Sequence, residues 1–558
     1  MNTSIKIGWI KPPFETGGLD HLGAQAPCIQ IYSQLLPGIT NVTDRARYYS
    51  FYPWLFAEFD KRGWLNQKKI VTQLRKADCL FTLISIRHGI KAGDVGDHAN
   101  SAVGSNTLTK IVTELLPGQE IFLTDFTHLE EPLKRYFKNP LGGFGQYYFG
   151  VLEGLRVMSG DSASNARLIR EIGVPLANAM SSGVQGDLFL HLIEADLVTL
   201  KDLDDLDSFC HCQLSSSVQE KNLLTGLMRG GWPAIAEIKN EVLTEEERAS
   251  IESRSKSLGL FIQLAGISEQ QKINLDIVCF RGLTYTHCDH SGNSINIKDS
   301  LRGNADIWQV YQRNELLAVA MQGFFSAILQ AAKNVSNLNG FMTTKEICSW
   351  FWKSHVCSRV IEDQSLSLRQ FLIKRFKGLP DFSEWKSPSH EIQLSEKIVQ
   401  LTHQTLTDDQ IVDLVEACFK CLAAICYRDE NTRIYEPVSF RQNYLSNYPI
   451  NLESINSIIN ESLRDIKVVD ALIRFTASYC LDSHLRVAMR KLRQQGQNTS
   501  RFELAENGIY IKEIPPATHT SPRFNQAMQI LLDLGLLCVK DELHAPTNKG
   551  LDFLKDIT

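Results

Sequence analysis

Hydrophobic positions recur at three- and four-residue spacings through most of the 558 residues, which is the period of amphipathic helices. Strand-like stretches rich in β-branched and aromatic residues are short, and the clearest pair lies within 276–286. The sequence therefore predicts a mainly α protein with small β elements. Single hydrophobic cores stop growing beyond about 250–300 residues, so a chain of 558 residues needs more than one core to bury its apolar positions. We expect three domains: 1–200, 201–450 with a small β insertion near 276–300, and 451–558.

The densest pattern lies in 35–62. Pro37-Gly38 predicts a turn, and a helix capped by Thr40 or Thr43 is expected to follow. An apolar face rich in tyrosine and phenylalanine then continues to Phe59. Because proline lacks the backbone N–H, Pro53 is expected to kink this element or to divide it into a helix pair.

Asp44, Arg45 and Arg47 stand at the predicted start of that helix. Residues two positions apart point about 200° apart on a helix, so one arginine is expected to face inward. An inward guanidinium beside Asp44 fits either a bound carboxylate or phosphate, or a buried structural network. Unpaired buried charge is scarce in proteins, and the structural network is the favoured interpretation.

The C-terminal pattern predicts a helix with Pro522 at its first position, then a two-stranded wing, then a last helix. Leu536–Val539 and Leu543–Thr547 form the predicted wing strands around Lys540, and the last helix starts near Lys549.

Composition narrows the class of protein. A hydrophobic content of 43% and a charged content of 22% are those of a soluble globular protein. The net charge of −5 excludes a protein coated in basic charge, so any nucleic-acid surface must be local. The densest basic run, the start of the C-terminal helix and the wing supply the candidate DNA contacts: Arg486, Arg490, Lys491, Arg493, Arg501, Arg523 and Lys540. The alternative for the basic run is a solvated helix face.

The N-terminus lacks the basic and apolar regions of a signal peptide, and no apolar run approaches the length of a membrane span. We therefore expect a cytoplasmic protein that does not bind a membrane. Its 13 cysteines are then expected to be reduced thiols in the core.

Two patterns were weighed as metal or anion sites. Cys210, Cys212, Cys279 and Cys288 have the ligand chemistry for zinc but lack the usual spacing, and the favoured prediction is no metal and no cofactor. The glycine-bearing loop 93–106 matches no phosphate-binding motif and is predicted to be a plain loop.

The sequence offers one possible catalytic site, that of a metal-dependent nuclease. Glu237-Ile238-Lys239 has the ExK form of one nuclease fold, and the acidic run from Asp202 to Asp207 offers further metal ligands. The residues around the tripeptide predict a helix where that fold needs a strand, and acidic runs are usually solvated. A non-catalytic protein is favoured, with a metal-dependent nuclease as the alternative.

The C-terminal pattern resembles that of winged-helix domains. The matching segments are Leu534-Gly535-Leu536-Leu537 and Thr547-Asn548-Lys549-Gly550-Leu551-Asp552-Phe553-Leu554. The resemblance covers the last forty or so residues and implies either a helix in the major groove of DNA or a protein-binding module.

A second resemblance covers more of the chain. Leu35–Thr40, Arg45–Trp54, Gly104-Ser105-Asn106 and Phe209–Cys212 resemble uncharacterised bacterial proteins that are encoded among anti-phage defence genes. Together the two resemblances imply a non-catalytic, DNA-associated accessory subunit of a defence or DNA-transaction complex. Its expected partners are double-stranded DNA and other subunits, and the further alternative is a scaffold that docks a partner through the winged helix.

Overall fold

The computed structural model describes residues 14–15, 20–64, 66–128, 139–230, 244–334, 343–432, 449–505 and 508–557. Helices account for 65% of the structure and strands for 6%, so the prediction of a mainly α protein is confirmed. The strands form only two-stranded sheets in the described ranges. Most cysteines are buried, and all are free thiols.

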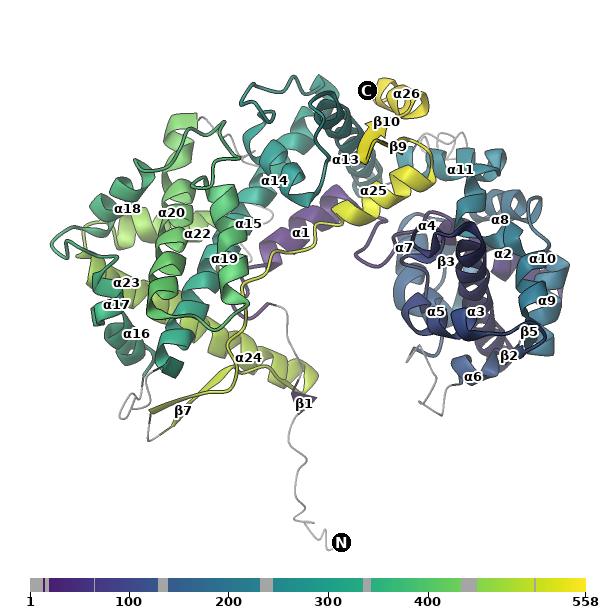
Figure 1. Cartoon of the computed structure of the whole chain (residues 1–558), viewed down its shortest axis with the longest axis horizontal. Helices are drawn as coiled ribbons and strands as arrows, with labels where there is room; N and C mark the ends of the chain where they lie inside the picture. The colour runs from purple at the N-terminus through teal and green to yellow at the C-terminus, as the bar shows by residue number, and fades with distance from the viewer. Residues whose placement is uncertain are drawn as a thin grey trace, which may run out of the picture. The chain divides into compact units, whose positions relative to one another are not determined.

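The chain divides into two compact units, each assembled from separated segments (Figure 1). Unit 1 comprises Met1–Tyr32, Val278–Asn296 and Ala305–Thr520, and unit 2 comprises Ser33–Ile277, Ile297–Asn304 and Ser521–Thr558. These are not the three consecutive domains expected from the sequence, because the C-terminal segment joins the N-terminal helices in unit 2.

Unit 2 holds most of the short sheets. Its helices are α2 (Tyr48–Lys61), α3 (Gln67–Ala92), α4 (Val95–Ala99), α5 (Ser105–Glu114), α6 (Thr124–Thr127), η1 (Phe144–Tyr148), α7 (Phe149–Gly154), η2 (Ala163–Asn165), α8 (Gly173–Ser181), α9 (Gly186–Ala195), α10 (Leu200–Asp205), η3 (Asp207–Phe209), η4 (His211–Ser215), α11 (Val218–Arg229), α13 (Glu245–Gln270), α25 (Phe524–Asp533) and α26 (Asn548–Lys555). Its antiparallel strand pairs are β2 (Glu120–Phe122) with β5 (Leu197–Thr199), β3 (Met158–Ser159) with β4 (Arg167–Leu168), and β9 (Leu537–Lys540) with β10 (Leu543–Pro546).

Unit 1 is more strongly helical. Its helices are α14 (Ile277–Thr286), α16 (Thr344–Lys353), α17 (His355–Ser358), α18 (Leu368–Phe376), α19 (Glu391–Thr402), α20 (Asp408–Thr432), α22 (Leu452–Ser457), η5 (Ile458–Ser462), α23 (Val468–Thr476), η6 (Ala477–Leu481) and α24 (Asp482–Gln495), and its strands are β1 (Phe14–Glu15), β6 (Gln497–Asn498), β7 (Phe502–Ala505) and β8 (Gly508–Ile511). Helices α1 (Ala26–Leu35) and α15 (Asp299–Asn334) contribute residues to both units.

The aromatic helix α2 lies in the core of unit 2. There the ring of Phe51 stacks on the ring of Phe81 from α3, with centroids 4.1 Å apart. The helix runs unbroken through Pro53, so the prediction of a divided pair is wrong. Burial of nearly the whole helix offsets the one backbone hydrogen bond that proline removes. The predicted caps are also displaced: the helix begins at Tyr48, and the Thr43 hydroxyl instead accepts a hydrogen bond from the Thr40 N–H (2.8 Å).

The strands predicted within 276–286 are a helix, α14. Every residue from Cys279 to Thr286 is buried, so the segment is buried on all sides and lacks the one-sided pattern of a surface helix. Its β-branched and aromatic residues pack in the core of unit 1 and do not form a sheet.

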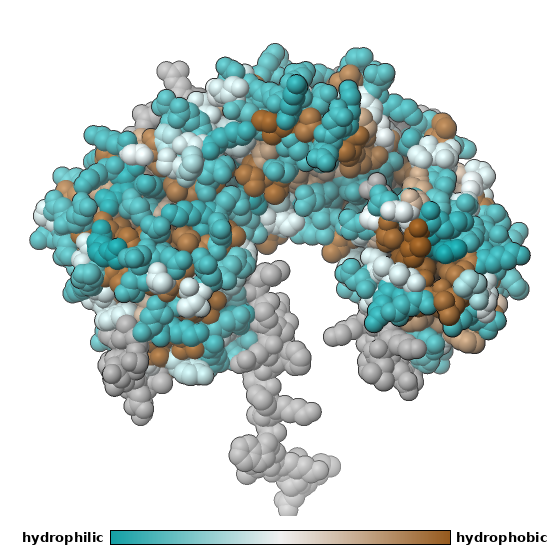
Figure 2. All heavy atoms as spheres, viewed as in Figure 1, coloured by the Kyte–Doolittle hydropathy of each residue, from teal (hydrophilic) through white to brown (hydrophobic). Residues whose placement is uncertain are grey.

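Helix α15 is long and apolar enough to cross a membrane, which the sequence reading did not anticipate. Its most apolar window is fully buried within the protein, as in a core helix of a soluble protein. On the face shown in Figure 2, hydrophilic residues dominate and hydrophobic ones lie in small groups.

The predicted order of C-terminal elements is present, but α25 begins at Phe524 and not at Pro522, because Arg523 adopts the left-handed region. Helix α25 is followed by the antiparallel pair β9–β10 and by α26, and Asp541 and Glu542 make the intervening turn with positive φ. A capping box of Thr244 and Glu247 starts α13, which packs against β10 and α26 within unit 2.

Candidate metal centre

Four metal-ligating side chains converge in unit 2. They are His88 near the end of α3, His98 on α4, and Cys210 and Cys212, which flank the start of η4. One ligand atom from each lies within 4.8 Å of the other three. Cys210 is buried, and the other three residues are partly buried.

The distances match a single tetrahedral ion. His98 Nδ1 lies 3.3 Å from Cys210 Sγ, and His88 Nδ1 lies 3.4 Å from Cys212 Sγ. Bond lengths of about 2.3 Å to sulfur and about 2.0 Å to nitrogen place tetrahedral N and S ligands about 3.5 Å apart. The cluster is too small for a two-iron cluster, in which the ligands of the two metals lie further apart.

A buried arginine fixes the loop that carries the cysteines. The Arg47 guanidinium donates to the carbonyls of Ser208 (2.7 Å) and Cys210 (2.5 Å). Its other edge faces the Glu220 carboxylate at 3.4 Å, and the Ser50 hydroxyl also donates to Glu220 (2.5 Å). Arg47 and Glu220 are almost fully buried, so this pair holds the cysteine loop on the start of α2.

A glycine brings the second histidine within reach of the first. A Cβ at Gly89 would lie 2.8 Å from Val95 Cα, 2.9 Å from the Asp94 carbonyl oxygen and 3.0 Å from His98 Cβ. Only glycine therefore allows α4 to fold back against the end of α3 beside His88. Gly93 in the left-handed region ends α3 and makes the turn between the two helices.

His211 lies between the two cysteines but turns away from the cluster. Its ring packs against Tyr48 and Phe81 with centroids 4.9 and 4.8 Å away. Burial lowers the pKa of His211 well below its ordinary value, and its nitrogens have no hydrogen-bond partner among the described residues. It is a neutral core histidine.

The surroundings favour a thiolate at Cys210. Hydrogen bonding from the Cys212 thiol, together with contacts to His98 and His88, lowers the pKa of Cys210 to about 4, against the opposing effect of burial. A thiolate is the form of cysteine that binds metal ions.

From the sequence, Cys210 and Cys212 were considered as zinc ligands together with Cys279 and Cys288. Cys279 and Cys288 belong to unit 1, where Cys279 Sγ contacts His290 Nε2 at 3.4 Å and Cys288 donates to the Thr286 carbonyl oxygen. In the described ranges, no third ligand completes a metal cluster there. His88 and His98 were missed, although His98 lies in the glycine-bearing loop that was examined for a phosphate.

Arg45 and Arg47 are both buried, although only one was expected to face inward. Both precede the first turn of α2, so the divergence of residues two positions apart on a helix does not apply to them. Arg45 pairs with Asp533 of α25 at 3.1 Å, and the Ala46 N–H donates to the same carboxylate. Burial raises the pKa of the neighbouring Asp44. Each arginine therefore has a carboxylate of the chain itself, as in a structural network.

The acidic run is also engaged within unit 2. Asp202 closes a capping box with Thr199 at the start of α10, and Asp204 pairs with Arg87 (2.8 Å) and Lys91. Hydrogen bonding from Arg87 lowers the pKa of Asp204. Glu237 and Lys239 of the nuclease alternative lie outside the described residues.

The seven candidate DNA contacts are divided between the two units. Arg523 donates to the Leu36 carbonyl oxygen and to Ser33 within unit 2. In unit 1, Arg501 pairs with Glu513 at 2.5 Å, and Lys491 donates to the Asp20 carbonyl oxygen. Lys540 is exposed on β9, and three arginines are exposed on one helix of unit 1: Arg486, Arg490 and Arg493 of α24.

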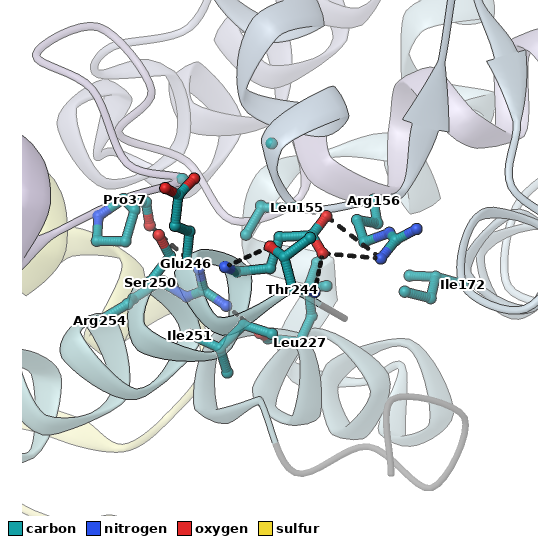
Figure 3. A pocket seen from close by; sticks show the side chains of 13 residues that line it. Pro37, Leu155, Arg156, Ile172, Leu227, Thr244, Glu246, Ser250, Ile251 and Arg254 are labelled. Carbon is teal, nitrogen blue, oxygen red and sulfur yellow. Dashed lines mark hydrogen bonds and ion pairs between the residues drawn. The ribbon is translucent and has the colours of Figure 1, made fainter. Parts of the chain in front are cut away.

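Unit 2 also contains a pocket of about 470 Å³ beside the start of α13 (Figure 3). Its buried Arg254 donates to the carbonyls of Pro37, Leu227 and Met228, and burial lowers the pKa of this arginine to about 10. Arg156 pairs with Glu247 on the wall at 3.3 Å. Positively and negatively charged side chains both line this pocket, so the charge of its lining does not indicate one class of ligand.

No family model, curated protein or solved structure matches the chain. The geometry of the described residues therefore carries the functional argument.

Proposed function

We propose that unit 2 binds one Zn²⁺ through His88, His98, Cys210 and Cys212, and that the protein is a zinc-stabilised, non-catalytic accessory protein. The observation that carries this proposal is the convergence of two imidazole nitrogens and two thiols at tetrahedral spacing. Two histidines and two cysteines are a ligand set that zinc prefers in structural sites.

A site with four protein ligands leaves no position for water or substrate, which distinguishes structural from catalytic zinc. The ion would join the neighbouring α3 and α4 to the segment before α11, which is more than a hundred residues further along the sequence. Such a cross-link stabilises a fold by restricting the unfolded chain.

The test is the zinc content of protein purified under reducing conditions. We expect one Zn²⁺ per chain in the wild type and none in Cys210→Ser/Cys212→Ser. The matched control is Cys279→Ser/Cys288→Ser, which removes two thiols from unit 1, one of them in contact with a histidine, and should keep the ion. Substoichiometric zinc in well-folded wild-type protein would refute the proposal. Should the first variant misfold, Co²⁺ reconstitution of wild-type protein gives a second readout, since tetrahedral sulfur and nitrogen ligands produce a distinctive visible spectrum.

For the wider role, we propose an accessory subunit of a defence or DNA-transaction complex. The support is the order helix, hairpin, helix in α25, β9–β10 and α26, which is the order that the winged-helix resemblance implies. Helix α25 uses much of its polar face within unit 2: Gln526 donates to the Asn41 carbonyl oxygen and Gln529 to Asp533. This favours protein docking over base reading for the C-terminal elements. Co-purification of a neighbour-encoded protein, lost on deletion of 521–558, tests it.

A further inference from the structure

We infer that α24 binds the phosphate backbone of double-stranded DNA through Arg486, Arg490 and Arg493. These arginines recur at four- and three-residue spacings, so they lie on one face of the helix. All three are exposed, and Met489 between them is 51% exposed. The inference is independent of zinc, because α24 belongs to unit 1 and the cluster to unit 2.

Other residues of α24 anchor the helix in unit 1. Ser483 donates to the Leu22 carbonyl oxygen (2.9 Å), and the buried His484 accepts a hydrogen bond from the Arg501 N–H (2.9 Å). Val487 and Ala488 are buried beside them. The arginine face is thus presented by a fixed helix, which limits the entropy lost when it binds a partner.

Charge in this region is unbalanced. None of the three arginines has an acidic partner within the described part of the chain, and Arg486 donates only to the Ser478 carbonyl oxygen. The nearby acids are engaged elsewhere: Glu513 pairs with Arg501, and Asp20 accepts from the backbone of residues 23–25. Burial lowers the pKa of Lys491, and the positive charge of Arg490 lowers it further. A protein of net charge −5 therefore carries a local cationic surface.

The chemistry of the face favours a duplex. Residues 486 to 493 span about 10 Å along a helix, and a B-form duplex presents about six phosphates over that length. Sites for single strands add aromatic rings on which bases stack, and this face offers only Met489. A membrane-surface helix would expose its apolar side, which α24 buries.

The experiment is a salt titration of the full-length protein binding to a fluorescent duplex of arbitrary sequence, from 50 to 200 mM salt. The test variant is Arg486→Gln/Arg490→Gln/Arg493→Gln. The matched control is Lys345→Gln/Lys353→Gln/Lys377→Gln, which removes the same charge from three exposed positions of unit 1. Thermal melting checks that all three proteins fold equally.

We expect the slope of log K against log salt to shrink by about 3 in the arginine variant and to stay constant in the lysine control. At 100 mM salt, the arginine variant should bind at least about tenfold more weakly. Equal losses in both variants would overturn the inference, since global charge would then account for binding. It would also be overturned by tighter binding to single strands or to vesicles containing anionic lipid, or by no binding to the duplex at 50 mM salt.

Discussion

Two clusters of buried polar side chains, one in each unit, differ in their balance of charge. In unit 1, Arg428 forms two hydrogen bonds of 2.8 Å with the Glu391 carboxylate, which also accepts from the Tyr285 hydroxyl (3.0 Å). In unit 2, the Cys210 and Cys212 thiols contact each other and the nitrogens of His98 and His88. The first cluster neutralises itself, whereas the second gathers four electron-pair donors at the spacing of metal ligands. Such a set of donors fits a metal ion.

Two fully buried helical carboxylates, Glu391 and Asp78, illustrate the same difference. Burial by itself would raise the pKa of Glu391, but His390 and Arg428 hold it below its ordinary value. No cation contacts Asp78 of α3 so directly, and burial raises its pKa to about 7 although Tyr52 and the Gly143 N–H donate to it. A neighbouring cationic side chain, and not the depth of burial, therefore determines whether a buried carboxyl group stays ionised.

The largest effect is expected from breaking the balanced cluster with Arg428→Met. Removing the guanidinium leaves Glu391 buried without a cation, which should lower the free energy of unfolding by about 3–5 kcal/mol. The double variant Arg428→Met/Glu391→Gln should recover most of that loss, because a neutral amide oxygen still accepts from Tyr285. Urea denaturation measures both variants. Equal destabilisation by the single and double changes would show that packing of Arg428, and not charge, stabilises unit 1.

The second prediction concerns Asp78 and pH. Because its folded pKa is raised, the folded protein binds a proton that the unfolded chain has already lost above about pH 4. The stabilisation is therefore present at low pH and is lost as pH rises towards 7. Between pH 5 and pH 8, this group should lower the free energy of unfolding by about 2 kcal/mol.

Asp78→Asn should flatten that part of the pH profile at a cost of about 1 kcal/mol, since the amide offers one acceptor where the carboxyl offers two. Denaturant titrations at several pH values measure it, with exposed Asp205→Asn as the control. A profile that is identical in wild type and Asp78→Asn would assign the pH dependence to other groups.

The structural features that could be predicted from the sequence are those that depend on residues close together in the chain. The order of the C-terminal helix, hairpin and helix was predicted correctly, because each is set by residues a few positions apart, whereas the start of the helix was misplaced by two residues. Helix α14 was read as strands because burial on every side removes its helical periodicity.

The metal cluster was beyond such reasoning. More than a hundred residues separate His98 from Cys210, and nothing in the spacing reports that α4 folds back on α3. The signals in the sequence were a histidine directly before a glycine, a second histidine in a glycine-bearing loop, and a Cys-His-Cys triplet. They become one site only through the tertiary structure.

The third prediction tests whether the charge pair of Arg47 and Glu220 supports the metal ligands. Arg47→Lys keeps a positive charge but loses the planar fork that reaches two carbonyls and a carboxylate together. Zinc affinity, measured by competition with a chromophoric chelator, should fall about 10–100-fold. Arg254→Lys is the matched control, because Arg254 is also buried in unit 2 but donates to the carbonyls of Pro37, Leu227 and Met228. A similar loss of affinity in both variants would mean that general destabilisation of unit 2, and not the loop contact, weakens the site.

The last prediction concerns Gly89, and it separates the geometry of the ligands from their charge. In Gly89→Ala, the new methyl group meets the backbone of residues 94 and 95, so α4 must shift and carry His98 with it. Overpacking of this kind costs about 1–3 kcal/mol, and zinc affinity should fall as well. Gly303→Ala is the control in another helix of unit 2, where a Cβ meets nothing within 4 Å and should be neutral or slightly stabilising. If Gly89→Ala lowered the melting temperature but kept full zinc affinity, the ion would tolerate displacement of His98, and its binding could not depend on the close approach of α3 and α4.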